Sequence, residues 1–300
     1  MTVPDTGVSI RFKRVAIVGV GLIGGSFALG LKAKGACGSV VGVGRDPQNM
    51  RVALERGIID QVETDASVAV RNADLILVAT PVAQFEAVFE CIAPALKPSA
   101  ILMDAGSTKQ DVVAAARRAL GARIAQFVPA HPIAGAEHSG AAAAKPDLYL
   151  NRRVVLAPLP ENSIASVDAV AAAWEICGAR IFRMSAAEHD ATFAAVSHLP
   201  HLLAFALVHE VAQRADSGRL FGYAAGGFRD FTRIASSHPE MWRDICVANR
   251  EALLAELDRY VDRLSSLRAP LAAGDGAALE KVFSDARDAR NRWLAGDFER

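Results

Sequence analysis

The stretch Gly19-Val20-Gly21-Leu22-Ile23-Gly24 decides the fold of this chain. It directly follows an apolar, β-branched run at residues 15–18 and opens an apolar helical segment at residues 26–31. A G-x-G-x-x-G pattern alone is a weak signal, but between a strand and a helix near the N-terminus it is typical of a dinucleotide-binding unit. A purely structural glycine turn is the less favoured interpretation.

Each glycine of this turn has a physical purpose. The first permits a tight turn, the second lets the backbone approach a pyrophosphate, and the third lets helix and strand pack closely. The N–H groups at the start of the helix and the positive end of its dipole then face the anion. We therefore expect the residues of this turn to contact the cofactor: Gly19, Gly21, Leu22, Ile23 and Gly24.

The end of the next apolar run, residues 40–43, indicates which dinucleotide binds. A cofactor without a 2′-phosphate usually meets an acidic residue there, about twenty residues after the glycine turn. In this chain Gly44 occupies that place and Arg45 follows it. Because a guanidinium pairs well with a phosphate, we expect Arg45 to bind the 2′-phosphate of NADP. NAD is the alternative, with Arg45 an ordinary exposed charge and Asp46 shifted to the ribose.

Strand-like apolar runs separated by helical stretches fill the first half of the chain. They lie at residues 15–18, 40–43, 75–78, 100–103, 124–128, 153–156 and, as a last candidate, 179–183. This alternation predicts a mostly parallel sheet that helices cover on both faces. Since the carboxyl ends of such strands face the ligand crevice, we also expect Thr80, just after the third run, at the cofactor site.

Helical periodicity replaces the strand-like runs from about residue 185. One apolar stripe has steps of mostly three or four: Trp242, Ile245, Cys246, Leu253, Leu257, Tyr260, Leu264 and Leu267. Pro239 suits the first turn of this helix and Pro270 its end, which gives roughly thirty residues and a length of about 45 Å. We favour a partner subunit that covers this length. The alternative is packing along the chain's own first domain.

Two domains follow from this change of pattern. We predict an α/β nucleotide-binding domain over residues 1–184 and an all-α domain for dimerisation and substrate binding over residues 185–300. The chain has 300 residues, of which 52% are apolar, and that is enough for two cores.

Charge and cysteine content exclude several classes of protein. The 33 basic and 33 acidic residues balance, so we expect neither nucleic acid nor an anionic membrane as a partner. The N-terminal residues do not resemble a signal peptide, and no uninterrupted apolar run reaches the ~18 residues of a membrane span. The four cysteines are far apart and form no C-x-x-C pair, which indicates a reduced, cytoplasmic setting without a zinc site.

Polar residues gather in three segments of otherwise apolar sequence. Asp104-Ala105-Gly106-Ser107-Thr108-Lys109 follows the run at 100–103, and His131-Pro132-Ile133-Ala134-Gly135-Ala136-Glu137 follows the run at 124–128. The third segment lies in the helical half and consists of Ser197-His198-Leu199-Pro200-His201 and Phe228-Arg229-Asp230-Phe231-Thr232-Arg233.

Together with the glycine turn, these segments closely resemble the prephenate and arogenate dehydrogenases. The resemblance runs from about residue 14 to about residue 267. H-P-I-A-G-x-E, S-H-L-P-H and F-R-D-F-T-R-I-A, in this order and spacing, are jointly very specific. The resemblance implies a Rossmann-type domain followed by a helical dimerisation domain, hence a homodimer.

The reaction that the resemblance implies is an oxidative decarboxylation in tyrosine biosynthesis. Hydride leaves C4 of a cyclohexadiene ring for the nicotinamide, the C4 hydroxyl loses its proton, and carbon dioxide departs as the ring becomes aromatic. The products are 4-hydroxyphenylpyruvate from prephenate and tyrosine from arogenate. These substrates differ only in a keto or amino group, and the sequence does not choose between them. An acid such as Glu137 or Asp230 would suit an ammonium, but the sequence places neither one there.

His131 is the expected proton acceptor. Imidazole titrates near neutral pH, and the resemblance places His131 against the C4 hydroxyl. The alternative is a histidine that stabilises the loop before Pro132. Ser107 resembles the serine that hydrogen-bonds the same hydroxyl and borders the nicotinamide. Its alternative is an ordinary turn residue after Gly106.

The remaining expected contacts are to the substrate. Arg233 resembles the arginine that holds the ring carboxylate, for which a planar guanidinium is well shaped, and its alternative is a surface arginine. By the same resemblance the pocket contains Ser197, His201, Glu137, Trp242 and Arg229. Glu137 has the alternative of a solvated acid, and the last two have the alternatives of core and surface positions. His198 and His201 alone are too few to indicate a metal, and we predict none.

Two other functions stay open at this point. One is a two-domain dehydrogenase of the hydroxyacid or imine-reducing type, which would use a base on the helical domain instead of His131. The other is a dinucleotide-sensing module without catalysis. The joint presence of Ser107, His131 and Arg233 argues against the second.

Overall fold

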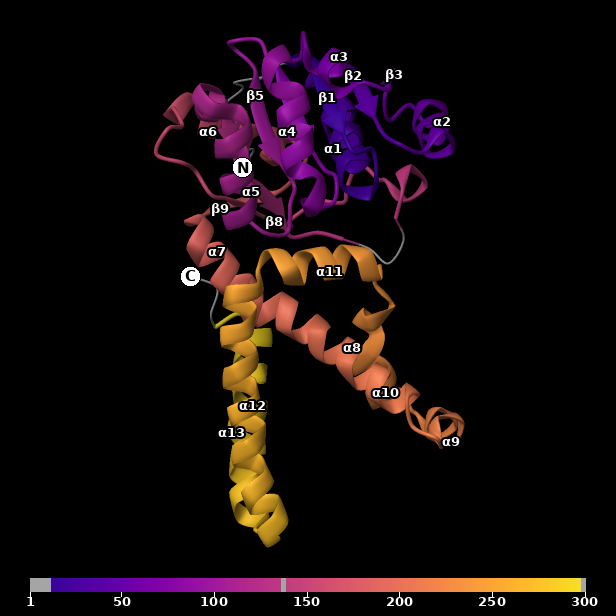
Figure 1. Ribbon diagram of the computed structural model, residues 1–300, viewed down its shortest axis with the longest axis vertical. Coiled ribbons are helices and arrows are strands. Elements are labelled where there is room, and N and C mark those ends of the chain that lie inside the picture. The colour runs from indigo at the N-terminus through magenta and orange to yellow at the C-terminus, as the bar shows by residue number, and fades with distance from the viewer. Residues whose placement is uncertain (1–11, 136–138, 298–300) are drawn as a thin grey trace, which may run out of the picture. The chain divides into compact units, whose positions relative to one another are not determined.

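The computed structural model describes residues 12–135 and 139–297. Its chain divides into two compact units, residues 1–250 and residues 251–300. The first unit contains the sheets and the helices up to α11, and the second consists of helices α12 and α13 (Figure 1).

Six parallel strands form the main sheet of the first unit, in the order β3-β2-β1-β4-β5-β6. They are β1 (Phe12–Val18), β2 (Cys37–Val43), β3 (Gln61–Glu63), β4 (Leu75–Val78), β5 (Ile101–Asp104) and β6 (Phe127–Val128). This is the strand order of a doubly wound dinucleotide-binding sheet, with its crevice where β1 adjoins β4. The predicted Rossmann-type α/β fold followed by a helical part is thus confirmed.

Alternate residues of each strand feed two separate cores, as the period of two in a strand requires. On one face Val15 and Ile17 of β1 pack with helices α1 and α6. On the other face Ala16 and Val18 pack with helices α4 and α5. The helices of this part are α1 (Leu22–Ala33), α2 (Pro47–Glu55), α3 (Ala66–Val70), α4 (Phe85–Ile92), α5 (Gln110–Leu120) and α6 (Ile164–Ile176). Short turns of 3₁₀-helix lie at η1 (Val82–Gln84), η2 (Ala93–Ala95), η3 (Gly121–Gln126) and η4 (Ala141–Ala143).

A second sheet corrects the expectation of one sheet. It contains β7 (Ala130–Pro132), β8 (Arg153–Leu156) and β9 (Arg180–Arg183), with β7 antiparallel to β8. The runs at 153–156 and 179–183 therefore lie in this second sheet. Most of the run at 124–128 is 3₁₀-helix, and only its last two residues form β6. The short strands β3 and β7 had no recognisable apolar run.

Helices make up the rest of the first unit. They are α7 (Ala186–Phe193), the π-helical turn η5 (Ala194–His198), α8 (Leu199–Ala212), α9 (Ser217–Tyr223), α10 (Gly226–Thr232), the 3₁₀ turn η6 (Arg233–Ser236) and α11 (Pro239–Ala248). Helix α11 packs against η1, which follows β4, and so lies along the carboxyl edge of the main sheet (Figure 1).

The single helix predicted between Pro239 and Pro270 is wrong. The chain forms α11 and α12 (Arg250–Ala273), separated at Asn249. Asn249 is buried, and its amide donates to the carbonyl of Asp190, which interrupts the helix at that point. Pro270 lies inside α12 and does not end it. The helix ends instead before Gly274, whose φ of +68° suits a glycine.

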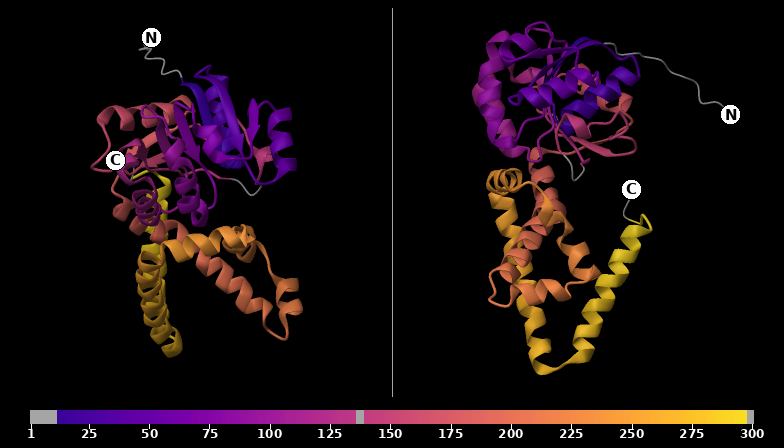
Figure 2. Two further views of the ribbon diagram at one scale, coloured as in Figure 1. Left: turned by 45° about the horizontal axis from the view of Figure 1, so that its top comes forward. Right: turned by 90° about the vertical axis from the view of Figure 1, so that its right-hand side faces the viewer.

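The second unit is a helical hairpin of α12 and α13 (Gly276–Leu294) whose two helices diverge from the turn that joins them (Figure 2). Exposed apolar side chains line one face of α12 at Leu254, Val261, Leu264 and Leu271. Others line α13 at Val282, Phe283, Trp293 and Leu294. Such faces are typical of helices that pack against another surface.

One stretch of the described chain, residues 186–212, is long and apolar enough by composition to cross a membrane. The stretch contains His189, Asp190 and His198, all buried. Lys109 and Gln110 of the α/β part donate backbone hydrogen bonds to Asp190. Because its buried carboxylate accepts hydrogen bonds from the nucleotide-binding fold, this stretch is part of the site described next.

Candidate active site

The glycine turn between β1 and α1 has the backbone geometry that its sequence predicts. Gly19 has a φ of +101°, and a Cβ there would lie 2.5 Å from the carbonyl oxygen of Ala79. A Cβ on Gly24 would lie 2.3 Å from the carbonyl oxygen of Gly19. A Cβ on Gly21 would meet nothing within 4 Å. Two glycines thus permit close packing, and the middle one leaves open space at the start of the helix.

This open space suits a dinucleotide. Helix α1 begins at Leu22, and Gly21 provides no side-chain cap for its N–H groups. Thr80 follows β4 at the same edge, and its buried hydroxyl has no hydrogen-bond partner among the described residues. Uncapped N–H groups and an unpaired hydroxyl at one crevice are groups that a pyrophosphate and ribose would satisfy.

The carboxylate of Asp104 joins the two predicted catalytic segments. Its Oδ2 accepts the N–H of Gly106 at 2.8 Å, and its Oδ1 accepts the N–H of Ala130 at 2.9 Å. Ser107 and His131 directly follow these two residues. The charge of Asp104 is balanced by Lys109, and both side chains are fully buried. The ion pair therefore holds the serine turn and the β7 strand at one place, the carboxyl edge of the sheet.

His131 forms a hydrogen bond with a second histidine, His189, that was not predicted from the sequence. Its Nδ1 lies 2.8 Å from Nε2 of His189, and Nδ1 of His189 lies 2.8 Å from Oδ1 of Asp190. The backbone N–H groups of Lys109 and Gln110 also donate to Asp190, each at 2.8 Å. An Asp–His–His chain thus runs from the start of α5, through α7, to β7. His131 keeps part of its surface exposed, whereas His189 has none.

Electrostatics keep both histidines neutral. Burial lowers the pKa of His131 well below its usual 6.5, and the proximity of the ionisable groups of His189, Lys109 and His198 lowers it further. Burial also lowers the pKa of His189, against a hydrogen bond to Asp190 that raises it. Burial raises the pKa of Asp190, but hydrogen bonds from His189, Gln110 and Lys109 outweigh it, so the net pKa is lowered. At neutral pH His131 is therefore unprotonated and can accept a proton.

A second group of predicted residues gathers around Trp242. Its indole stacks on the ring of His201, with centroids 3.5 Å apart and planes at 17°. Nδ1 of His201 donates to the carbonyl of Ser197 at 2.8 Å. Burial lowers the pKa of His201, against the hydrogen bond to Ser197 that raises it, and the charge of Arg233 lowers it further. The buried Nε1 of Trp242 has no acceptor among the described residues.

Other predicted residues lie at the surface or outside the described chain. Arg229 on α10 and Arg233 in η6 are exposed, as is Arg45 after β2. Ser107 is half-buried in the turn before α5. Glu137 falls outside the described residues.

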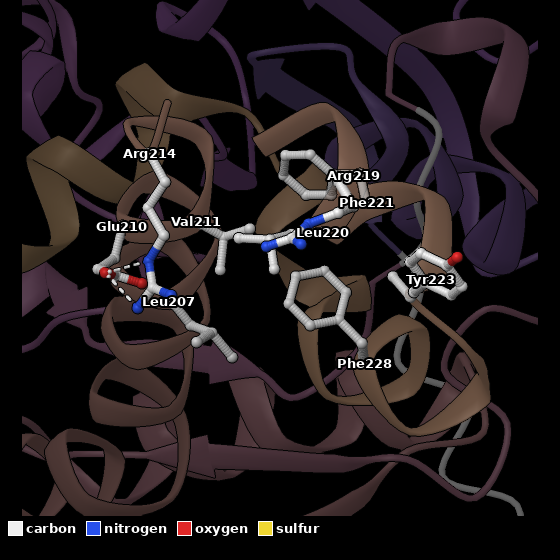
Figure 3. Close-up of a pocket in the computed structure, with 10 residues that line it drawn as sticks. Leu207, Glu210, Val211, Arg214, Arg219, Leu220, Phe221, Tyr223 and Phe228 are labelled. Atoms are coloured by element: carbon white, nitrogen blue, oxygen red, sulfur yellow. Dashed lines mark hydrogen bonds and ion pairs between the residues drawn. The ribbon is translucent and has the colours of Figure 1, made fainter. Parts of the chain in front are cut away.

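A separate hollow of about 520 Å³ lies between α8, α9 and α10, and contains none of the predicted site residues (Figure 3). Apolar side chains such as Leu207, Leu220 and Phe228 line it, with the Glu210–Arg214 ion pair at one side.

The sequence did not identify three buried polar residues of this region: His189, Asp190 and Asn249. His189 and Asp190 are adjacent polar residues in an otherwise apolar helical stretch that begins with a Ser185–Glu188 capping box. Two polar residues in such a stretch could have indicated a functional site. Asn249 donates to the carbonyl of Asp190 at 2.8 Å and pairs with Nδ1 of His198 at 3.0 Å. It lay within the apolar stripe that predicted a continuous helix.

Fold and site together define a class. A doubly wound parallel sheet, an open glycine turn at its switch point and a neutral histidine at the same edge are features of an oxidoreductase that uses a nicotinamide dinucleotide.

Comparisons with known proteins identify the family. Residues 27–183 match the nucleotide-binding domain of prephenate dehydrogenase, and residues 185–285 match its dimerization domain. The chain is 38% identical to the cyclohexadienyl dehydrogenase of Zymomonas mobilis, over 93% of this chain and 95% of that protein. It is 35% identical to the prephenate dehydrogenase of Bacillus subtilis, over 92% and 75% of the two chains.

Solved structures agree. The prephenate dehydrogenase from A. aeolicus in complex with hydroxyphenyl propionate and NAD⁺ has a TM-score of 0.87 and 33% identity, over 93% of this chain and 98% of that one. Synechocystis arogenate dehydrogenase has a TM-score of 0.79 and 28% identity, over 93% and 99%. The chain belongs to the prephenate dehydrogenase family. It is a dehydrogenase of tyrosine biosynthesis that uses a nicotinamide dinucleotide, as the sequence predicted.

Proposed function

We propose that this chain catalyses the oxidative decarboxylation of prephenate, arogenate or both, with His131 as the proton acceptor. The observation that carries this assignment is the position of His131: a neutral, partly exposed imidazole at the edge of the sheet where the glycine turn opens. A neutral histidine accepts the proton of an alcohol as hydride leaves the same carbon. When bound, the nicotinamide supplies the hydride acceptor.

Each of the other predicted side chains has a role in this proposal. Ser107 donates a hydrogen bond to the C4 hydroxyl beside His131, since Asp104 holds both of their segments. Arg233 binds the ring carboxylate, which must later leave as neutral carbon dioxide. Trp242 and His201, whose rings stack, form a wall of the pocket. Ser197, Arg229 and Glu137 complete the pocket.

The test is a matrix of initial rates, with prephenate or arogenate as substrate and NAD⁺ or NADP⁺ as cofactor, for the wild type and His131→Asn. We expect turnover in at least one well, and a loss of at least ~100-fold in kcat/KM for the variant, the usual size of a general-base contribution. Cofactor affinity should stay unchanged. Near-normal turnover by His131→Asn would support a base on the helical domain instead. No turnover in any well, with intact cofactor binding, would reject the proposed function.

NADP is the proposed preferred cofactor. Gly44 leaves no carboxylate at the end of β2, and a Cβ there would lie 2.4 Å from Sδ of Met50. Asp46, the acid that NAD binding would need, caps α2 by accepting the N–H of Gln48 at 2.9 Å. The side chain of Arg45 is exposed, so it can reach the 2′-phosphate of a bound NADP. We expect Arg45→Ala to raise the KM for NADP⁺ about 10-fold and leave the KM for NAD⁺ within about 2-fold, the size of one charge-assisted contact. Equal changes for both cofactors would contradict this assignment.

The proposed assembly is a homodimer in the cytoplasm, with a domain boundary between residues 184 and 185. Support comes from the match of residues 185–285 to a dimerization domain and from the exposed apolar faces of α12 and α13. The hollow between α8, α9 and α10 adds further apolar surface in the same domain (Figure 3).

A further inference from the structure

We infer that His189 and Asp190 form a positioning pair that fixes the tautomer of His131, so that Nε2 of His131 presents its lone pair to the substrate hydroxyl. This inference rests on the proposed function, in which His131 is the base. Neither His189 nor Asp190 needs to touch the substrate, because they act through the imidazole of His131.

Asp190 is held as a carboxylate by its hydrogen-bond donors. Both of its carboxylate oxygens accept backbone N–H groups, Oδ1 from Lys109 and Oδ2 from Gln110, each at 2.8 Å. Backbone N–H groups only donate, so a proton on either oxygen would face a donor. Asp190 is therefore a carboxylate, and the net lowering of its pKa agrees. Nδ1 of His189 lies 2.8 Å from Oδ1 and must carry a hydrogen to donate to it.

The tautomer of His131 then follows. His189 is neutral, so with a hydrogen on Nδ1 its Nε2 holds only a lone pair. Nδ1 of His131 lies 2.8 Å from that Nε2 and has to be the donor. A neutral His131 with its hydrogen on Nδ1 has an unprotonated Nε2. Nε2 of His131 is thus the ring nitrogen able to accept a proton.

Packing fixes the geometry of the two rings. His189 is fully buried, and the ring of Phe193, one turn further along α7, lies 4.5 Å from it and 5.0 Å from His131 between centroids. The phenyl ring keeps water away from the bond between the histidines. The strand β7 holds one histidine and α7 the other, so neither ring can turn without loss of this bond.

The pair also stabilises the charge that forms during the reaction. As hydride leaves C4, the hydroxyl proton passes to Nε2 of His131, which becomes an imidazolium that donates from Nδ1 to His189. The electron pair of the breaking bond between C1 and the carboxylate moves into the ring, carbon dioxide leaves, and the ring oxygen takes the proton back. The anionic Asp190, connected through His189, stabilises the positive charge on His131 for as long as His131 holds this proton.

Histidine side-chain NMR of the ¹⁵N-labelled protein without ligands tests the tautomer directly and does not depend on turnover. We expect the proton of His131 on Nδ1 in the wild type. In His189→Asn, we expect this tautomer to lose its dominance, because the shorter amide reaches Asp190 but leaves Nδ1 of His131 without an acceptor. A proton on Nε2 of His131 in the wild type would overturn the inference.

Kinetics of two variants at one position provide the second test. His189→Asn should lower kcat by about 100-fold, with KM within about 3-fold, because the base loses its orientation. His189→Gln should recover at least about 10-fold of that loss, since its longer amide places an oxygen near the position of Nε2. His209→Asn, an exposed histidine on α8, is the control and should match the wild type. Asp190 is avoided because it also caps α5.

The outcomes separate the two proposals. A kcat for His189→Asn within about 3-fold of the wild type, with unchanged cofactor affinity, would overturn the positioning role. Equal losses for the Asn and Gln variants would overturn it too, since a packing defect predicts that result. If the wild type turns over neither substrate, the proposed function fails, and the NMR experiment still decides the tautomer.

Discussion

The α/β part and the helical part of this chain bury their apolar residues to very different degrees. Between residues 12 and 183 two complete cores lie on the faces of one sheet. Between residues 185 and 297 the buried apolar residues are few: Phe193, Ala194, Leu199, Ala204, Trp242, Ile245 and Leu253. Most of the large apolar side chains there are exposed or only partly buried. The first part buries its apolar side chains within itself. The second part has as many apolar side chains as a protein core but leaves many of them exposed to solvent.

The candidate site lies where these two parts meet in the first unit. Asp104 and His131 come from the α/β part, and His189, Asp190 and Asn249 from the helices. A helical part that gains its core from a second subunit would therefore also hold the site in place.

The largest expected effect is on assembly. Leu264→Glu on α12 places a charge on a face that the proposed dimer buries, and we expect the dimer to weaken by at least about 100-fold, to a monomer at micromolar concentration. Leu54→Glu on α2, where the native residue is 42% exposed, is the matched control and should stay dimeric. Light scattering after gel filtration measures both. If both variants dissociate, or neither does, the contrast between the two parts fails.

Acid should destabilise the region where the parts meet. Burial lowers the pKa of His131, His189, His198 and His201, and that of His198 falls to about 4. Between the lowered pKa values of the folded chain and the usual value of 6.5, the unfolded chain binds more protons than the folded one. The free energy of unfolding therefore falls as the pH drops below 6.5. Urea unfolding between pH 7.5 and 4.5 measures this slope. His131→Asn removes one of the groups and should flatten it. A stability that is constant over this range would contradict the neutral state of these histidines.

A pair of glycine variants separates folding from cofactor binding in the α/β part. Gly24→Ala should destabilise the protein by about 3 kcal/mol, because its Cβ meets the backbone of Gly19. Gly21→Ala should cost about 1 kcal/mol or less, since its Cβ meets open space. It should nevertheless weaken cofactor binding at least about 10-fold, because the methyl group fills the place of the pyrophosphate. Thermal melts and cofactor titration check both, and unaltered affinity in Gly21→Ala would show that the cofactor lies elsewhere.

The smallest effect concerns the break between α11 and α12. Asn249→Ala leaves the carbonyl of Asp190 without its side-chain donor, and we expect a loss of about 1–2 kcal/mol in the free energy of unfolding. Asn291→Ala, an exposed position on α13, should change it by less than about 0.5 kcal/mol. Denaturant unfolding compares the two. A more stable Asn249→Ala variant would mean that the continuous helix expected from the apolar stripe is the better solution.

Local patterns predicted the parts of this site that depend on neighbours in sequence. The glycine turn needs only a strand before it and a helix after it, and each of its three glycines has the expected geometry. The sequence also predicted that Ser107 and His131 follow strands, and ligands bind at the carboxyl ends of the strands of a parallel sheet. The structure adds that a single carboxylate, Asp104, joins their segments.

Long-range pairings were out of reach. His131 and His189 are separated by 58 positions, and no periodicity in the sequence links a three-residue strand to an apolar helix. The break at Asn249 was missed for a related reason. A helical stripe continues through it, and only its hydrogen bonds to a distant helix show why the chain turns. The second sheet was missed because strand-like runs do not specify which sheet they join.

Asp190 has an evolutionary consequence. The same carboxylate accepts the first N–H groups of α5 and holds His189. A lineage that replaced Asp190 would lose a helix cap and the orientation of two histidines in one step, and a single second mutation could hardly restore both. The start of α5 and the pair of histidines are therefore expected to change together during evolution or not at all. Substitutions around Asp190 should be rare even where stability or chemistry alone would permit them.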